Sequence, residues 1–328
     1  MALTLVEAAK YSNDILQVKV IEKLVYKDPI LERIGWVEIT GNGLTYDVEK
    51  TMSGASFYAV GGTWSESTSE VDQTTAVLKI MGGDADVDNF LKATRSNLQD
   101  LKQEQIEAKI KAIRRLWSTT FYYGYITGNA LEFDGMHYLL RSSTSPYDNV
   151  VATATSSGTA ILLQMERLEK AVDLCRDGAD LIVMSKQMRR SINKYLHGVG
   201  GITYMDGANG RIQQLFEVPV AVSDEIRDNE SADLQYGTNE SGTAVYGHNY
   251  ADAAAEDNDG ATSIFVLKFD PKACVGVSNG ILTVEPIGPL ESKNADRTRV
   301  KWYTAIMLQS IIRCSKVTGI DVDGVVAA

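Results

Sequence analysis

The sequence is poor in the residues that form metal sites and disulfides, and it lacks membrane spans. Among its 328 residues, three are cysteines, Cys175, Cys274 and Cys314, and three are histidines. No Cys–x–x–Cys or His–Glu–x–x–His spacing occurs, so neither a zinc site nor a disulfide framework is expected. No apolar run approaches the roughly 18 residues of a membrane span, and the opening MALTLVEAAKYSNDIL does not resemble a signal peptide. We therefore expect a soluble protein of a reducing compartment, without metal or cofactor.

Catalytic patterns are also scarce. One matches: residues 276–280, GVSNG, have the GxSxG form of hydrolases, in which the serine lies on a strand-to-helix turn and the catalytic histidine follows in the chain. Here the next residues, ILTVEPI, favour a strand, and the last histidine, His248, comes before the motif. His137, His197 and His248 are isolated and are expected to be ordinary surface or core residues. The sequence predicts no catalytic residue; a hydrolase acting through Ser278 is the enzymatic alternative.

Negative charge is concentrated in one stretch. The formal net charge is −11. Between Ser223 and Gly260, ten acids stand against the single base Arg227, a balance of −9, and the rest of the chain carries only −2. No basic patch therefore indicates nucleic-acid binding. We expect a solvated acidic surface loop, and its EDNDG run lacks the ligand spacing of a calcium-binding loop.

The most regular stretch runs from Asn97 to Thr127. Its apolar residues mostly recur every three or four positions, which places them on one stripe of an α-helix. They are Leu98, Leu101, Ile106, Ile110, Ile113, Trp117 and Phe121. At about 1.5 Å per residue, this helix would run roughly 40–45 Å, long enough to act as a strut. The alternative is a core helix of an ordinary α+β enzyme.

Residues 36–81 favour a long β-hairpin. Apolar and polar residues alternate near its start, with Leu44, Tyr46 and Val48 on one face, and 77–81 (VLKIM) is the expected return strand. The stretch between is rich in Gly, Ser and Thr and contains Trp64. A two-stranded ribbon is marginal in water, so something else must cover it, which indicates assembly. Trp64 has no evident local core to enter, so we expect it to contact another subunit.

The second half of the chain alternates helices and strands. Helices are expected at 159–176 and 185–195, and strands at 179–184, 217–222 and 264–269, which together predict a compact α/β unit at roughly 156–277. Strands follow at 281–287 and 298–314. Long strands so late in the chain need early partners, most simply residues 75–90 beside the long helix. The compact unit would then be inserted into a discontinuous helix-and-sheet unit.

This order of elements resembles that of the major capsid proteins of tailed bacteriophages, the Hong Kong 97 fold. The resemblance covers essentially the whole chain. It is carried by the opening MALTLVEAAKYSND, the hairpin at 37–81, the helix end FYYGYITGN (121–129) and the return segment 275–318. It implies an α+β fold with an N-terminal arm (1–35), an extended loop (36–81), a peripheral domain (82–155 and 278–328) with the spine helix 97–127, and an axial domain (156–277).

The resemblance also implies a structural function. Such subunits assemble as hexamers and pentamers into an icosahedral shell around phage double-stranded DNA, so the expected location is the virion, after assembly in the host cytoplasm. The expected partners are other copies of the chain, portal and scaffolding proteins, and decoration proteins, with no sequence-specific DNA contact and no membrane. Some members crosslink a loop lysine; Lys50 lies on a strand, so no crosslink is expected. The alternative on the same fold is an encapsulin-like bacterial nanocompartment shell.

Overall fold

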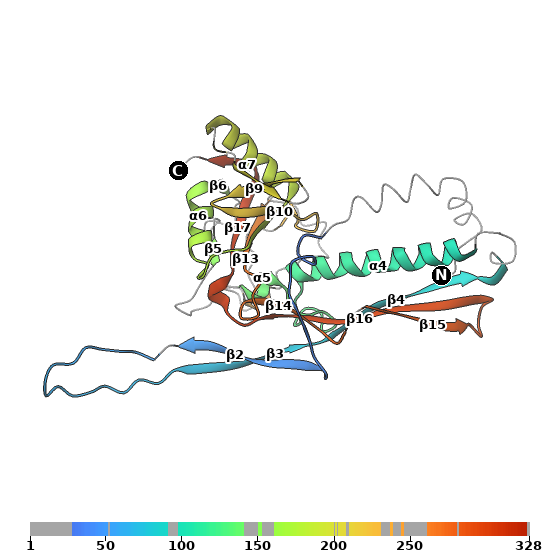
Figure 1. The fold of residues 1–328 in the computed structure, drawn as a ribbon, viewed down its shortest axis with the longest axis horizontal. Helices are drawn as coiled ribbons and strands as arrows, with labels where there is room; N and C mark the ends of the chain where they lie inside the picture. Colours follow the sequence, from blue (N-terminus) through green and yellow to red (C-terminus); the bar gives the residue numbers. More distant parts are fainter. Residues whose placement is uncertain are drawn as a thin grey trace.

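A computed structural model of the chain shows an elongated molecule (Figure 1). A long hairpin projects from one end, a long helix lies along a sheet in the body, and a second sheet with two helices stands beside the end of that long helix. The structure describes residues 28–51, 53–90, 98–140, 150–152, 161–199, 201, 203–207, 210–230, 237–238, 244–245, 261–280 and 282–326.

The body is built on a five-stranded sheet. Its central strand is β16 (Ala295–Leu308), which pairs with β4 (Lys79–Asp88) along one edge. Along the other edge lie β14 (Cys274–Ser278) and β15 (Thr283–Pro289). The short strand β1 (Trp36–Glu38) adds a parallel neighbour to β14. The ten-residue register between β4 and β16 confirms the pairing expected between the early and late strands.

Helix α4 (Leu98–Tyr123) lies along this sheet and packs on β4 and β16. Its 26 residues correspond to about 39 Å. The predicted apolar stripe is confirmed from Ile106 onward, because Ile113, Trp117 and Phe121 are buried and Ile106 and Ile110 pack against the same core. The side chains of Leu98 and Leu101 lie outside the described part of the structure. Met81 of β4 is buried in the same core as these helix residues. Ala85 and Val87, which lie on the same face of the strand, are buried as well.

The helix ends at Tyr123, four residues before the predicted end, and Gly124 explains why. The Gly124 N–H still donates to Thr120 O (2.8 Å), but its carbonyl accepts from Gly135 N (2.8 Å), a residue of the returning chain. A Cβ at Gly124 would lie 2.1 Å from Phe133 O. The chain after the helix therefore folds back directly over this glycine, and only a residue without a side chain fits there.

The projecting hairpin consists of β2 (Gly43–Thr51) and β3 (Glu70–Val77), which pair antiparallel as expected. Tyr46 is buried where the hairpin joins the body, while residues 53–69 extend past the last strand pair (Figure 1). The predicted return strand at 77–81 is wrong. Pairing with β2 stops at Val77, and the chain then enters β4 in the other sheet. Of the apolar residues of VLKIM, Leu78 and Met81 are buried in the body at that corner, whereas Ile80 is exposed.

A second sheet of eight strands has the order β5-β17-β13-β7-β10-β9-β8, with β6 also pairing with β17. Its strands are β5 (Val150–Ala152), β6 (Ile161–Gln164), β7 (Leu181–Met184), β8 (Thr203–Gly207), β9 (Gly210–Leu215), β10 (Val218–Val222), β13 (Ala261–Leu267) and β17 (Ser315–Val326). A separate pair is formed by β11 (Gly237–Thr238) and β12 (Ala244–Val245).

The two faces of this sheet belong to different cores. Helices α6 (Met165–Asp173) and α7 (Lys186–Val199) cover one face, against residues such as Ile182 and Val266. The other face joins the core around the end of α4 and the short helix α5 (Met136–Leu139), through Leu181, Val183, Phe265 and Leu267. Since adjacent residues of β7 and β13 face opposite sides, these two strands are buried throughout, and they join the two halves of the molecule.

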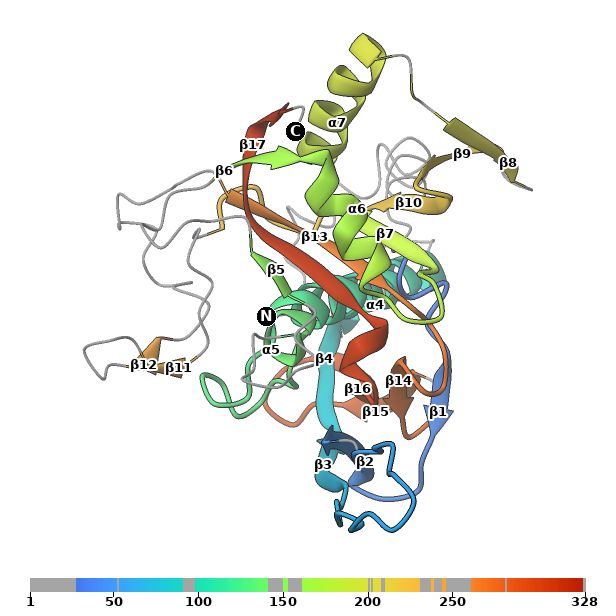
Figure 2. The ribbon, with the colours of Figure 1, turned by 90° about the vertical axis from the view of Figure 1, so that its left-hand side faces the viewer.

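Two sequence predictions for this region need correction. The helix expected at 159–176 begins only at Met165, because Ile161–Gln164 forms β6 and pairs with β17. Residues 315–326, expected with the helix-and-sheet unit, form β17 and lie in the eight-stranded sheet between β13 and the short strands β5 and β6 (Figure 2). A 3-10 turn at Ile311–Arg313 carries the chain from β16 into it. The helix expected at 185–195 is confirmed as α7, with Met188 N donating to Ser185 Oγ (3.1 Å).

Candidate assembly surface and domain junction

The tip of the projecting hairpin is held by its own side chains. Tyr58 stacks on Trp64 with ring centroids 4.3 Å apart, and Ser65 N donates to the Tyr58 hydroxyl (3.1 Å). A further bond from Ser67 Oγ to Gly54 O (2.8 Å) links the two sides of the loop. Trp64 therefore has a local partner, contrary to the sequence analysis, which overlooked Tyr58. These contacts give the tip a defined shape although it projects away from the body.

The same tip exposes large apolar side chains. Phe57 and Val60 are fully exposed and Trp64 is 79% exposed despite its stack. These three residues of one loop expose apolar surface that water solvates poorly, and exposed apolar residues on a projecting element are typical of interaction sites. The prediction that Trp64 contacts another subunit stays a prediction.

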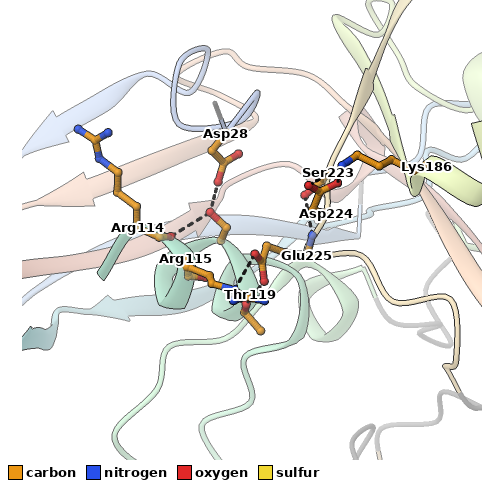
Figure 3. Close-up of polar contacts among 9 residues, drawn as sticks. Asp28, Arg114, Arg115, Thr119, Lys186, Ser223, Asp224 and Glu225 are labelled. Atoms are coloured by element: carbon orange, nitrogen blue, oxygen red, sulfur yellow. Dashed lines mark hydrogen bonds and ion pairs between the residues drawn. The ribbon is translucent and has the colours of Figure 1, made fainter. Parts of the chain in front are cut away.

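A second site lies where the two sheets meet. Residues 223–230, which we call the strap, leave β10 and cross the C-terminal half of α4 (Figure 3). Glu225 of the strap accepts from Arg115 Nε (3.1 Å) and from Thr119 Oγ1 (2.8 Å), one helical turn apart. The preceding strap residue, Asp224, pairs with Lys186 at the start of α7 (2.7 Å). The strap thus ties the long helix to the helix layer of the second sheet.

The far end of the strap is fixed by a buried glutamate. Glu230 is 4% exposed and accepts from Tyr123 Oη and from Ser263 Oγ. Arg227 N donates back to Tyr123 Oη (2.8 Å), and the Arg227 guanidinium lies 5.4 Å from the Tyr123 ring centroid. Burial, reinforced by the Glu230 charge, raises the pKa of Tyr123 well above its usual value, so the phenol stays a donor.

His137 of α5 completes this cluster. Its ring stacks on Tyr123 and its Nε2 lies 3.5 Å from Glu230 Oε1. Complete burial lowers the pKa of His137, although Glu230 opposes the shift, so the imidazole is neutral at neutral pH. Lys316 of β17 is also buried, and its Nζ donates to His137 O (2.8 Å). Glu230 and Lys316, from distant parts of the chain, therefore both contact His137.

The acidic stretch at 223–260 is thus only partly what the sequence predicted. Most of it lies outside the described residues. Within the strap, however, Glu225 and Glu230 are bound to the protein rather than solvated. Sequence reasoning missed the strap because its partners, Thr119 and Tyr123, were counted as helix residues without regard to what packs on them. Arg115, Thr119 and Tyr123 follow one another at intervals of four, which places all three on one face of the helix, and that signal was available.

A third contact reaches α4 from the start of the described chain. Asp28 accepts from Ser118 Oγ, on the neighbouring row of the helix, and from Ile30 N (2.9 Å) in its own turn. Figure 3 shows Asp28 and Glu225 approaching adjacent faces of the same helical turn. Burial raises the pKa of Asp28; backbone hydrogen bonds from Ile30 and Leu31 oppose the shift, and the charges of Glu225 and Glu32 add to it.

Comparison with known proteins identifies the architecture. No model of a protein family and no curated protein matches the chain. Among solved structures, the chain is similar to the holo-SrpI encapsulin of Synechococcus elongatus PCC 7942, with 14% identity, TM-score 0.64, and 100% of this chain and 99% of that chain covered. It is similar to the capsid of a native GTA particle (14%, 0.59, 90% and 91%) and to a structure of Mycobacterium phage Bobi (13%, 0.58, 97% and 99%). The chain has the Hong Kong 97 capsid fold.

Within this capsid fold, the GxSxG sequence has a structural place. Ser278 ends β14, is 7% exposed, and its carbonyl accepts from Ile39 N (2.9 Å). Gly280 follows with φ +98°, the conformation of a turn. No helix begins there, so the hydrolase elbow predicted as an alternative is absent at this position. His197 is exposed on α7, His137 lies in the junction described above, and His248 lies outside the described residues.

The cysteines and the possible metal ligands are the remaining groups that could carry chemistry in this fold. Cys175, Cys274 and Cys314 are free and buried, and burial raises the pKa of Cys314 to about 12. Across the described ranges, no three His, Cys, Asp or Glu side chains gather where they could bind a metal ion. No helix in that part of the chain has the length and hydropathy to cross a membrane.

Proposed function

We propose that this chain is the major capsid protein of a tailed bacteriophage and that it assembles as hexamers and pentamers into an icosahedral shell around double-stranded DNA. The observation that carries the proposal is the capsid fold, matched over 90% or more of this chain and of the GTA and phage Bobi chains. The function is architectural, with no catalytic residue. The subunit resides in the virion after assembly in the host cytoplasm.

The projecting hairpin supplies a reason to assemble. An isolated two-stranded ribbon is marginal in water, and this one carries exposed Phe57, Val60 and Trp64 at its tip. Burial of apolar area contributes about 25 cal/mol per Å², and aromatic side chains are frequent anchors of protein interfaces. A neighbouring subunit that covered the tip would stabilise both the ribbon and the shell.

The negative charge of the subunit fits a shell that encloses DNA without binding it through each subunit. With a formal charge of −11, the subunit as a whole repels the phosphate backbone, so the shell would hold DNA by closure instead of by contact with each subunit. The proposed partners are therefore first of all other copies of the chain. Portal, scaffolding and decoration proteins would complete the particle.

A second candidate is an encapsulin-like shell that encloses a protein cargo. It is favoured by one observation, the likeness to the SrpI encapsulin over 100% of this chain at a TM-score of 0.64. Both candidates require a closed shell made of this subunit, and they differ in the contents of the shell.

Electron microscopy of the purified protein, with analysis of what the particles contain, tests both candidates. Closed shells or capsomer rings are expected. Particles recovered from the native host that contain double-stranded DNA would support the phage function, whereas a specific co-purifying protein without DNA would support the encapsulin function. A discrete dimer or tetramer that does not assemble even with its scaffolding protein would contradict both.

The role of the hairpin tip is tested by replacing Phe57, Val60 and Trp64 together with serine. All three side chains are exposed, so the subunit should fold with an unchanged circular dichroism spectrum and unfolding midpoint. Shell formation, measured by light scattering and microscopy, should fall at least tenfold, because a loss of about 1.4 kcal/mol per contact already gives that factor. The matched control, Phe57→Tyr with Val60→Ile and Trp64→Tyr, keeps the apolar surface and should assemble. Normal shells from the serine variant would show that the tip is not part of the interface between subunits.

A further inference from the structure

Two carboxylates from separate segments meet on one turn of the long helix. Asp28 belongs to the turn that precedes β1, and Glu225 belongs to the strap that follows β10. Asp28 contacts Ser118 and Glu225 contacts Thr119, which are adjacent residues of α4 (Figure 3). Asp28 therefore attaches the turn at residues 29–33 to α4.

The hydrogen bonds around Asp28 are best satisfied when its carboxyl group carries a proton. Ser118 Oγ has one hydrogen but faces two acceptors, Asp28 Oδ2 and Arg114 O (3.0 Å). If Asp28 is ionised, the serine can donate to only one of them. If Asp28 is protonated, its O–H donates to Ser118 Oγ, and the serine hydrogen is free to donate to Arg114 O. Ile30 N donates to the other carboxyl oxygen in both states.

The charges around Asp28 also favour the protonated form. Glu32 lies in the same turn, and Glu225 approaches from the strap; both act on Asp28 electrostatically. Arg115 is engaged with Glu225 and therefore offsets part of that negative charge. From α4 itself, the group that Asp28 contacts is the neutral Ser118. In this setting an ionised Asp28 is desolvated next to like charges, which is costly.

We propose that Asp28 anchors the turn at residues 29–33 on α4 in a pH-dependent manner. The turn is held firmly on α4 when Asp28 is protonated and loosens when Asp28 is ionised. Glu225 of the strap sets how strongly the turn responds to pH. The device would couple the docking of this turn to pH and to the strap. It is independent of whether the shell encloses DNA or protein.

The sign of the effect follows from linkage. The pKa of Asp28 is raised in the folded protein, first by burial, so the docked turn binds a proton more tightly than the undocked turn does. Docking is therefore strongest below the ordinary aspartate pKa of about 3.9 and weakens as pH rises through the raised pKa. Asp28→Asn mimics the protonated state, since an amide accepts from Ile30 N and donates to Ser118 Oγ.

Hydrogen–deuterium exchange of the full-length subunit tests this proposal, with rates corrected for the intrinsic effect of pH. The reporters are the amides of Arg33 and Ile34, which both donate to Ile30 O (3.0 and 2.8 Å). In the wild-type protein, their protection should fall several-fold as pH rises from weak acid to above neutrality. In Asp28→Asn the protection should stay high across the range. The same fall in Asp28→Asn, or constant protection in the wild type, would overturn the proposal.

A second variant tests the coupling without altering the turn. Glu225→Gln removes the charge but keeps an acceptor for Thr119, so the wild-type fall in protection should become smaller and its midpoint should move to lower pH. The matched control is Asp88→Asn. Asp88 also caps its own turn, with Phe90 N donating to Oδ1 (2.7 Å), but it lies at the end of β4 opposite Ala295 of β16, so the response of the 29–33 turn should be unchanged. An unaltered midpoint in Glu225→Gln would refute the coupling.

Discussion

At the scale of single residues, Trp117 is the centre of the core beneath the long helix. It is completely buried and its ring lies 5.3–6.5 Å from the rings of Trp36, Phe121, Phe133 and Trp302. Its indole N–H donates to Thr304 Oγ1 (3.3 Å) on β16, which satisfies the one polar atom of the side chain. Three strands or segments far apart in sequence are therefore joined through one side chain.

Replacing Trp117 with alanine should cost about 3–5 kcal/mol in the free energy of unfolding, because a buried aromatic ring is lost and a cavity remains. Urea unfolding followed by circular dichroism measures this loss. Trp64→Ala is the matched control: the side chain is 79% exposed, so the change should stay within about 0.5 kcal/mol. Equal effects of the two substitutions would contradict the assignment of core and tip.

Prediction of single buried residues succeeded where the helical spacing of apolar residues identified the buried face. Ile113, Trp117 and Phe121 were placed on one buried stripe by their spacing alone, and they are buried. It failed where a polar side chain finds its partner across the fold. Glu230 was assigned to a solvated loop but is buried against Tyr123 and Ser263, because composition carries no information about contacts between distant segments.

At the scale of elements, the residue at which a helix or strand begins or ends depends on the segment that packs against it. The long helix was predicted from its periodicity, yet it ends at Tyr123 because the returning chain lies over Gly124. The segment 161–164 was predicted as helix because its apolar residues fit either period. Pairing with β17, more than 150 residues later, makes it a strand. In both cases the deciding partner is tertiary.

Gly124→Ala tests this account of the helix end. A Cβ there would meet Phe133 O at 2.1 Å and Thr120 O at 2.7 Å, and backbone atoms cannot move aside easily. We expect a loss of about 1–3 kcal/mol in unfolding free energy, as for other overpacked sites, measured by thermal or urea unfolding. At Gly35 a Cβ would meet nothing within 4 Å, so Gly35→Ala is the control and should be nearly neutral. If Gly124→Ala were more stable than the wild type, the returning chain would have to move to accommodate the added Cβ, which would contradict this account of the helix end.

At the scale of the whole molecule, the discontinuous architecture was predictable, because long strands late in a chain require early partners, and β4 with β16 confirms this. The sequence did not reveal that the chain crosses between the two sheets once more, from β16 into β17. A strand pattern predicts a strand but not the sheet to which it is added. The division into domains therefore stays a prediction, with residues 150–152, 274–277 and 315–326 as the parts to revise.

Net charge yields a prediction for the complete subunit. Copies that each carry a formal −11 repel one another, and salt screens this repulsion over a Debye length that falls from about 10 Å at 0.1 M to about 3 Å at 1 M. Shell formation should therefore increase between about 0.05 and 0.5 M NaCl, as measured by light scattering. The serine variant of the hairpin tip should stay at least tenfold below the wild type at each of these concentrations. Assembly that weakens with salt would indicate attractive ion pairs between subunits.

The position of β17 has a consequence for synthesis on the ribosome. This strand pairs with β13 on one edge and with β5 and β6 on the other, yet it is translated after all of them. Until it emerges, the nascent sheet is split in two, with unpaired edges that invite contact with other chains. A chain cut short before residue 315 would lack the strand that closes the gap. The second sheet is therefore completed only in chains that have been translated through β17.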